Sequence, residues 1–419
     1  MDMLEGLVAK FSAQFETEVK KEVPVTFKLA VSNAINELSQ GVQRVKGHLR
    51  HGFLDYSFLR RNDGVLFEGH EEDGTCNAYA AAGLFKDGSA EQLAAVVVHR
   101  NLWHYTFEVF VKKDNKRGAD AILNVITRHL TEENPVSGKV INLKGDIRTL
   151  DNLDWDAVAI PPQYRQELER TILFPMRNYK ELKEMRLFKP RGVLFAGEVG
   201  MGKSLAGKII AKKVTEFGGT VIMTTPAEVG SLPTPEWKYV FEVAGTLRPT
   251  LLYVEDVETS GTSGSPKMYQ LSEYLDGLED RKDVMLLVTT NELDSLDRRL
   301  RERPGRIDRV LTFDPKKPEF AADWRKQVLA IHLNGNRGLQ ADVEEIAGMV
   351  GNRPYSGAQL AELVSSAIGI VLHGKGLAQA ASPDRKVVLD SRVIAKAIEV
   401  LDRTYNLRRP IGFTTNQKT

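Results

Sequence analysis

The sequence contains a single cysteine, Cys76, so no disulfide bond can form within the chain. We therefore expect a reducing compartment and predict a cytoplasmic location. Long apolar runs are also missing, because a run such as Leu93–Val98 is far shorter than the roughly 20 residues that a membrane-spanning helix requires. The first residues include Asp2 and Glu5 and lack a basic start followed by an apolar stretch, so no signal or transit peptide is expected.

Neither sign of charge predominates. The chain has 57 lysines and arginines against 56 aspartates and glutamates, which gives a formal net charge of +1. This balance offers no electrostatic argument for a nucleic-acid or membrane-surface partner, and neither is expected. The histidines of the first 150 residues form no metal-binding spacing with one another or with Cys76, and the chain has no H-E-x-x-H motif, so a metalloprotease domain is not predicted.

What the sequence does contain is a glycine-rich loop at residues 197–204. Its letters, GEVGMGKS, match the phosphate-binding pattern G-x-x-x-x-G-K-[ST]. A predicted buried strand, Gly192–Ala196, leads into the loop, and a predicted helix, Leu205–Val214, leaves it. Glycines let backbone N–H groups turn toward a phosphate, and the helix adds the positive end of its dipole. The alternative is a turn with a surface lysine. The residues expected to bind ATP here are Gly197, Glu198, Val199, Gly200, Met201, Gly202, Lys203, Ser204 and Leu205, with the Ser204 hydroxyl also on Mg²⁺.

Two acids, Glu255 and Asp256, end the apolar stretch Leu251–Val254. At the carboxyl edge of an open α/β sheet, one acid can hold Mg²⁺ while the other orients and deprotonates the attacking water. A further predicted strand, Met285–Thr289, leads to Asn291, whose amide could position that water. Taken alone, the acids could be a solvated loop and the asparagine a turn residue.

Strand and helix patterns alternate between residues 151 and 315, which predicts a parallel, doubly wound α/β sheet of the P-loop NTPase class. The apolar spacing becomes helical over residues 316–407, which predicts a C-terminal helical subdomain, and residues 408–419 are expected to form a tail. The strand candidates are Gly192–Ala196, Thr220–Met223, Thr250–Val254, Met285–Thr289 and Val310–Phe313.

Residues 1–150 are predicted to form a small α+β domain without a catalytic motif. A polar stretch that ends in Pro161 and Pro162 separates it from the sheet. Helices are predicted over Met3–Val19, Phe27–Val42 and Ala119–Leu130, and strands over Val65–Phe67, Ala94–Val98 and Tyr105–Val111.

From about Asn152 to Phe413 the chain resembles the AAA subgroup of the AAA+ ATPases. GEVGMGKS resembles their Walker A motif, LLYVED their Walker B motif and LLVTTN their sensor-1 strand. RERPGRIDR resembles their arginine-finger segment, AIHLNG their first lid helix and YSGAQLAELV their sensor-2 helix. DWDAVAIPP resembles the stretch whose backbone meets adenine.

The resemblance implies a Mg-ATP-hydrolysing ring, expected to be hexameric, that remodels a protein client. Arg303 and Arg306 would then act on the ATP of a neighbouring subunit, although such an arginine cluster is a solvated face in most proteins. The resemblance also assigns adenine contacts to Val158 and Ala159, and lid contacts to His332, Gly357 and Ala358.

The chain departs from the family pattern at two places. Most family members have Asp-Glu at Walker B, whereas this chain has Glu255-Asp256, an inversion that resembles the mitochondrial Rieske-protein translocase subgroup. Asp256 is therefore the expected base and Glu255 the expected Mg²⁺ ligand. The segment Thr225–Pro235, where unfoldases carry an aromatic residue, has none and contains three prolines. We therefore predict that the client is held by residues 1–150 and is not threaded. A nucleic-acid motor or loader and a non-hydrolysing switch are the alternatives.

Overall fold

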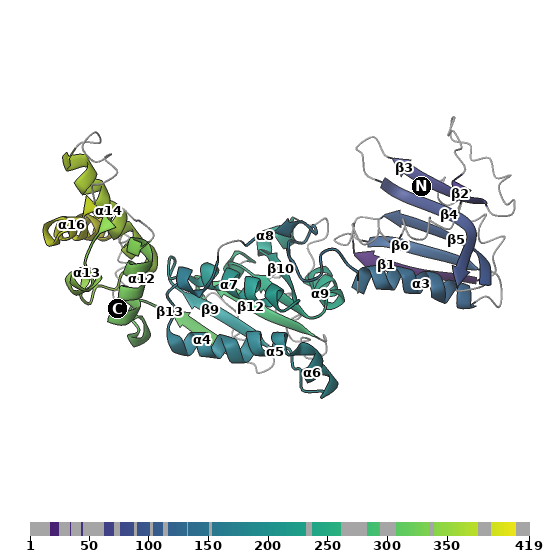
Figure 1. Cartoon of the computed structure of the whole chain (residues 1–419), viewed down its shortest axis with the longest axis horizontal. Coiled ribbons are helices and arrows are strands. Elements are labelled where there is room, and N and C mark those ends of the chain that lie inside the picture. Colours follow the sequence, from purple (N-terminus) through teal and green to yellow (C-terminus); the bar gives the residue numbers. More distant parts are fainter. Residues whose placement is uncertain are drawn as a thin grey trace, which may run out of the picture. The chain divides into compact units, whose positions relative to one another are not determined.

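The computed structural model consists of a β-sheet with helix α3 near the N-terminus, a larger and mostly parallel sheet, and a group of helices near the C-terminus (Figure 1). The structure describes residues 17–24, 34, 43–44, 63–70, 76–87, 90–100, 104–111, 116–131, 133–150, 153–231, 237–260, 283–293, 307–334, 339–375 and 387–407.

Six strands form the N-terminal sheet, in the order β1-β6-β5-β4-β3-β2. Neighbouring strands are antiparallel apart from β2 and β3, which are parallel. Helix α3 (Lys116–Thr131) packs against β4, β5 and β6, and this arrangement confirms the predicted α+β class. The strands are β1 (Thr17–Pro24), β2 (Gln43–Arg44), β3 (Asp63–His70), β4 (Cys76–Asp87), β5 (Ala90–Arg100) and β6 (His104–Val111).

The helix predicted over Met3–Val19 is wrong at its C-terminal end, because Val19 lies in strand β1. Val19 and Val23 are four residues apart, and that spacing places them on one face of a helix and equally on one face of a strand. Pairing of β1 with β6, from Thr17 opposite Val111 to Pro24 opposite His104, decides in favour of the strand. The second predicted helix lies outside the described residues except for Ala34, which is helical and buried.

The larger sheet has seven strands in the order β13-β9-β12-β11-β10-β7-β8. Strands β12 and β13 both run parallel to β9, β10 runs parallel to β7, and only the pair of β7 and β8 is recorded as antiparallel. This sheet confirms the predicted P-loop NTPase fold class, and all five predicted strands are present. The strands are β7 (Val140–Ile141), β8 (Ile147–Arg148), β9 (Gly192–Gly197), β10 (Thr220–Thr224), β11 (Thr250–Val254), β12 (Val284–Thr290) and β13 (Arg309–Phe313).

Burial explains why the central strands read as almost unbroken apolar runs. Every residue of β10, β11 and β12 is buried, as expected for a parallel sheet with both faces covered. A row of aromatic rings continues from this core toward the C-terminal helices. Phe195 lies 5.2 Å from Phe313 between ring centroids, Phe313 lies 5.8 Å from Phe320, and Phe320 lies 5.2 Å from Trp324. The row fixes the position of Trp324 relative to β9.

Some helices lie between the strands of the seven-stranded sheet in chain order, and others come after its last strand, β13. Tyr164 of α4 donates a hydrogen bond of 2.8 Å to the Thr312 carbonyl and so ties α4 to β13. The helices are α4 (Pro162–Leu168), α5 (Phe174–Arg177), α6 (Tyr179–Glu184), α7 (Lys203–Glu216), α8 (Pro226–Gly230) and α9 (Trp237–Thr246), with the π-helical η3 (Glu169–Leu173) and the 3₁₀ helices η2 (Trp155–Ala157), η4 (Val257–Ser260) and η6 (Pro318–Phe320). The C-terminal lid contains α12 (Ala322–Asn334), α13 (Val343–Val350), α14 (Gly357–Lys375) and α16 (Ser391–Leu407), together with the short strands β14 (Leu339–Gln340) and β15 (Val387–Val388).

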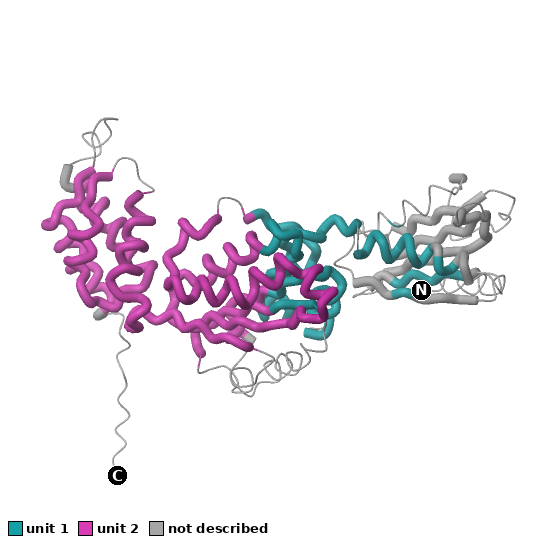
Figure 2. The backbone as a smooth tube through the Cα atoms, turned by 60° about the horizontal axis from the view of Figure 1, so that its bottom comes forward, with its two compact units in different colours: residues 1–149, 214–252, 277–285 teal, residues 150–213, 253–276, 286–419 magenta. Residues whose placement is uncertain are grey.

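Contacts divide the chain into two compact units, which Figure 2 colours separately. The first comprises residues 1–149, 214–252 and 277–285, and the second comprises residues 150–213, 253–276 and 286–419. Every residue of the site described below belongs to the second unit. The domain limits predicted at residues 150, 315 and 407 stay predictions. No helix among the described residues has the length and apolar character that a membrane span requires.

Candidate functional site

The glycine-rich loop between β9 and α7 has a backbone that only glycine adopts readily at three positions. Gly197, Gly200 and Gly202 have φ angles of 140°, 80° and 91°. A Cβ atom on Gly197 would also lie 2.0 Å from the carbonyl oxygen of Phe313 in β13. The loop therefore depends on glycine for both its turn and its contact with the neighbouring strand, and its backbone can curve around a small anion.

Lys203, the first residue of α7, is held inside this loop. Its ammonium group donates hydrogen bonds to the carbonyl oxygens of Gly197, at 2.6 Å, and of Glu198, at 2.7 Å. Burial lowers the pKa of Lys203, and the negative charges of Glu258, Asp256 and Glu198 oppose that shift. With only 5% of the residue exposed, its charge is directed at the inside of the loop rather than at solvent.

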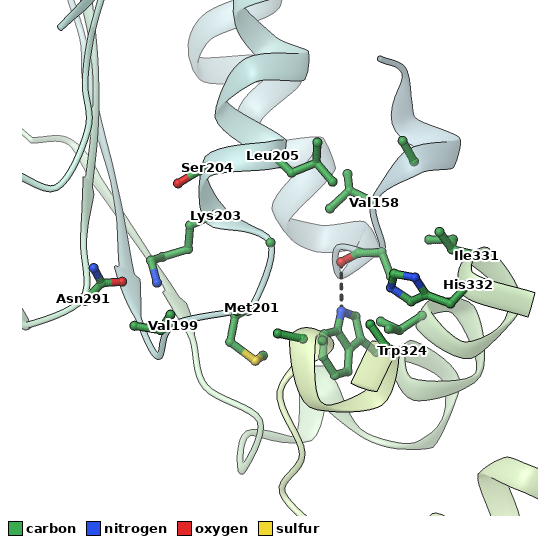
Figure 3. A pocket seen from close by; sticks show the side chains of 18 of the residues that line it. Val158, Val199, Met201, Lys203, Ser204, Leu205, Asn291, Trp324, Ile331 and His332 are labelled. Atoms are coloured by element: carbon green, nitrogen blue, oxygen red, sulfur yellow. Dashed lines mark hydrogen bonds between the residues drawn. The ribbon is translucent and has the colours of Figure 1, made fainter. Parts of the chain in front are cut away.

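A pocket of about 450 Å³ extends from the loop to the lid. Its volume lies within the range of small-ligand sites, roughly 300–1,000 Å³. Figure 3 shows Lys203 and Asn291 at one end and Trp324, Ile331, His332 and Val158 at the other. A cation and an amide at one end and apolar side chains at the other fit a nucleotide, whose phosphates are charged and whose base is flat and weakly polar.

The apolar end of the pocket is built around Trp324. Its indole Nε1 donates a hydrogen bond of 2.9 Å to the carbonyl oxygen of Ala159, which fixes the Val158–Ala159 stretch against the lid. Burial lowers the pKa of His332, which favours a neutral imidazole beside this apolar surface. Trp324, Val328 and Ile331 were not predicted, but they recur at the i, i+4, i+7 spacing that leads to His332 on one face of α12.

The lid touches the glycine-rich loop directly. The backbone N–H of Ala358 donates a hydrogen bond of 2.9 Å to the Gly200 carbonyl. A Cβ atom on Gly357 would lie 2.9 Å from the same oxygen, so glycine is needed where α14 begins. Helix α14 therefore begins at the mouth of the pocket.

The two acids after β11 have different surroundings. Asp256 lines the pocket and has φ of 50°, a left-handed conformation that is uncommon outside glycine, asparagine and aspartate. The Thr289 hydroxyl of β12 accepts a hydrogen bond of 3.1 Å from the Asp256 N–H, and Thr259 donates two to the Asp256 carbonyl. Glu255 is absent from the pocket lining, and its carboxylate accepts a hydrogen bond of 2.9 Å from the Tyr253 hydroxyl.

Tyr253 connects the acids to the helix that follows the loop. The side chain is completely buried, and its hydroxyl lies 3.4 Å from the Ser204 carbonyl as well as 2.9 Å from Glu255. Burial, reinforced by the Glu255 charge, raises the pKa of Tyr253 far above its usual value, so the hydroxyl keeps its proton. Gly207 of α7 leaves the space for this ring, because a Cβ atom there would lie 2.4 Å from the tyrosine oxygen.

Substituting Gly207→Ala is expected to lower the free energy of unfolding by about 1–3 kcal/mol, because the new methyl group overlaps Tyr253. Gly369→Ala is the matched control, because Gly369 is exposed in the middle of α14 and a Cβ atom there would have no other atom within 4 Å. The control should gain about 0.5–1 kcal/mol from its better helix propensity. Urea unfolding of both variants measures this, and a stabilised Gly207→Ala protein would contradict the close packing.

Asn291 at the end of β12 is held by an acid that was not predicted. Its side-chain amide donates a hydrogen bond of 2.8 Å to Glu258, and its backbone N–H donates another of 3.1 Å to the same oxygen. Glu258 follows the two predicted acids in the 3₁₀ helix η4. The sequence signal was a third acid within four residues, Glu255 to Glu258, directly after an apolar strand.

The pocket brings together most of the predicted site residues. Three predicted residues, Gly197, Glu198 and Glu255, do not line the pocket. The carbonyl oxygens of Gly197 and Glu198 accept hydrogen bonds from Lys203, and the Glu255 carboxylate accepts one from Tyr253. Arg303 and Arg306 lie outside the described residues. Predicted residues that line the pocket are Val158, Ala159, Val199, Gly200, Met201, Gly202, Lys203, Ser204, Leu205, Asp256, Asn291, His332, Gly357 and Ala358.

Ser204 and Glu255 stay the predicted Mg²⁺ ligands. Within the described part of the chain, no three metal-ligating side chains gather at one place. Magnesium usually takes one or two protein ligands and completes its shell with phosphate oxygens and water. Ser204 lines the pocket, and the Tyr253 hydroxyl lies near both the Ser204 backbone carbonyl and the Glu255 carboxylate.

A family model of known proteins matches the region that contains the glycine-rich loop and the acids after β11. Residues 193–315 match the family model described as ATPase family associated with various cellular activities (AAA). The match extends from β9 through the glycine-rich loop, both acids and Asn291 to the residues just after β13. This part of the chain is therefore similar to the ATPase domains that the AAA family model describes.

Curated relatives share this region at modest identity. The chain is 27% identical over 256 residues to the 26S proteasome regulatory subunit 4 homolog of Saccharomyces cerevisiae, covering 57% of this chain and 56% of that protein. It is 30% identical over 243 residues to the Tat-binding homolog 7 of Caenorhabditis elegans, covering 54% and 18%. It is 26% identical over 274 residues to the proteasome-activating nucleotidase of Pyrococcus abyssi, covering 62% and 67%. The chain thus spans just over half of the length of the first relative and about a fifth of the second.

Proposed function

We propose that this chain is a ring-forming ATPase that couples hydrolysis of Mg-ATP to remodelling or release of a protein client. The observation that carries the proposal is the pocket itself. It joins a glycine-rich loop with a buried lysine, an acid held by its backbone, a positioned asparagine and a lid with an apolar face. The AAA family match over residues 193–315, which include the glycine-rich loop, Asp256 and Asn291, supports ATP as the nucleotide.

In this proposal each group acts on one part of the substrate. Lys203 binds the β- and γ-phosphates in place of the two carbonyl oxygens that it now contacts. Asp256 accepts a proton from the attacking water, and Asn291 orients that water. Ser204 and Glu255 would hold Mg²⁺, which when bound would neutralise charge on the phosphate oxygens. Trp324 and Val158 exclude water from the base.

Ring assembly is proposed from the arginine segment. Arg303 and Arg306 lie in the stretch that resembles the AAA arginine-finger segment, and β13 begins soon after it at Arg309. An arginine supplied by a neighbouring subunit can contribute roughly 10³–10⁵ in rate, which would make the assembled ring the active form. We propose a homo-oligomer, with six subunits as the expected number.

A protein client is proposed from the relatives, two of which are named for the proteasome. We propose that residues 1–150 hold this client and that the chain has no protease of its own. The segment after β10 supports handling without threading. Val229, one of its two sizeable apolar residues, is 2% exposed inside α8, and Glu228 of the same helix pairs with Arg148 at 2.7 Å. The other, Leu232, lies outside the described residues.

One assay with two readouts tests the proposal. The full chain is incubated with Mg-ATP and a stably folded fluorescent reporter, and both phosphate release and reporter fluorescence are followed. We expect phosphate release that rises more than linearly with chain concentration, and no loss of fluorescence. Absence of phosphate release favours the non-hydrolysing switch, and salt-sensitive stimulation by DNA or RNA favours a nucleic-acid motor. ATP-dependent loss of fluorescence would show that the client is threaded.

A further inference from the structure

Glu258 makes more contacts with Asn291 than Asp256 does. One Glu258 oxygen accepts hydrogen bonds from both the side-chain amide and the backbone N–H of Asn291, at 2.8 and 3.1 Å. The Asp256 carboxylate lies 3.4 Å from the same amide nitrogen. The N–H groups of Asn291 that make these contacts are therefore directed at the carboxylates of Glu258 and Asp256.

These contacts determine which atom of the asparagine is left for substrate. Because the amide nitrogen is bound to Glu258, the amide oxygen points the other way, toward the side on which Figure 3 shows Lys203. An amide oxygen only accepts hydrogen bonds. Asn291 thus offers an acceptor to the pocket, which suits a water molecule and does not suit a phosphate oxygen.

The position of Glu258 is also electrostatically costly for nucleotide binding. The second oxygen of its carboxylate is shielded from solvent and has no hydrogen-bond partner among the described residues. Of the acids that raise the pKa of Lys203, Glu258 has the largest effect, ahead of Asp256. A negative charge so close to the lysine that receives phosphates repels those phosphates. A group kept in such a place calls for an explanation beyond stability.

We propose that Glu258 is a positioning residue for hydrolysis: it turns the Asn291 amide oxygen toward the attacking water and, by its charge, weakens the binding of nucleotide. The inference rests on the proposed ATPase activity. It separates two effects that an ordinary structural contact would not separate, because removing the charge should tighten binding while it slows the reaction. The same repulsion would speed the release of ADP.

Glu258→Gln in the full chain tests the proposal. Binding of ADP and of a non-hydrolysable ATP analogue is measured by calorimetry, and hydrolysis by phosphate release. We expect nucleotide Kd to fall by about 3- to 10-fold, as for loss of one charge a few ångströms away in a partly solvated site. We expect kcat to fall by about 10- to 100-fold, because a neutral amide oxygen accepts the two Asn291 hydrogen bonds less strongly than a carboxylate oxygen, so that Asn291 holds the attacking water less well. Glu292→Gln is the matched control, since it removes an exposed charge one residue beyond Asn291 and should leave both values unchanged.

Glu258→Asp separates charge from reach. Aspartate keeps the charge but withdraws it by one methylene from Asn291, so Kd should stay at the wild-type value while kcat falls. Wild-type kcat in Glu258→Gln, or weaker binding in that variant, overturns the proposal. If the wild-type chain releases no phosphate, the proposed function fails and this inference fails with it. If the wild type is active and only the variants behave otherwise, this inference alone is wrong.

Discussion

Lys203→Ala should lower the affinity for ATP by roughly 10²–10⁴-fold and abolish turnover. Lys203 is the first residue of α7 and is buried. Its ammonium group lies 2.6 and 2.7 Å from two carbonyl oxygens of the loop. Two charge-assisted hydrogen bonds to phosphate oxygens contribute about 1.5–3 kcal/mol each, and 1.4 kcal/mol corresponds to a factor of ten. No other lysine or arginine among the described residues lines the pocket, so no described side chain can replace this charge.

Calorimetric titration with ADP and an ATP analogue measures this loss. Lys208→Ala is the matched control, because it removes the same charge from the same helix at a position that does not line the pocket. The Lys203 variant should stay folded, since the oxygens that lose their donor belong to a loop that water can reach at Glu198. Wild-type affinity in a folded Lys203→Ala protein would remove the lysine from the site.

The sequence predicted the parts of the site that depend on local pattern. The glycine spacing of residues 197–204 requires particular backbone angles, and the structure shows positive φ at each of its three glycines. The central strands β10, β11 and β12 were readable because every residue in them is buried, which leaves threonine as their only polar residue type apart from the tyrosine hydroxyl of β11. In these segments the local chain and the tertiary structure impose the same requirement.

The parts that were missed depend on contacts between distant segments. Trp324 lies 165 residues from Ala159 in sequence, and only folding reveals that its indole binds that carbonyl. Glu258 and Asn291 meet across 33 residues, and a glutamate in a loop is by itself an ordinary solvated residue. The spacing of Val19 from the apolar residues around it fits both a helix and a strand, so the sequence alone could not decide between them. Pairing of β1 with β6 makes Val19 part of a strand. Sequence patterns indicate which face of a helix or strand is buried and where the chain turns. Which distant residues contact each other depends on the topology of the fold.

Asp256→Asn is expected to lower kcat by about 10²–10⁴-fold while ATP stays bound, as for loss of a general base. Asparagine is the suitable replacement for a structural reason. Asp256 has φ of 50°, and asparagine tolerates this left-handed backbone nearly as well as aspartate does, whereas alanine adds strain of about 1–2 kcal/mol. The hydrogen bond from the Asp256 N–H to the Thr289 hydroxyl does not involve the Asp256 side chain, so it survives the substitution. The variant therefore removes the base and preserves the turn.

Single-turnover phosphate release, together with binding of ATP, measures the effect of Asp256→Asn. The comparison variant is Glu255→Gln, whose side chain contacts Tyr253 and does not line the pocket. It should weaken the dependence on Mg²⁺, and the opposite pattern, in which Glu255→Gln traps ATP, would mean that the two acids exchange roles.

Mixing Asp256→Asn subunits with Arg306→Ala subunits should restore part of the activity, because one interface of such a ring combines an intact acid with an intact arginine. Mixtures with no more activity than either variant alone would argue that each subunit works by itself.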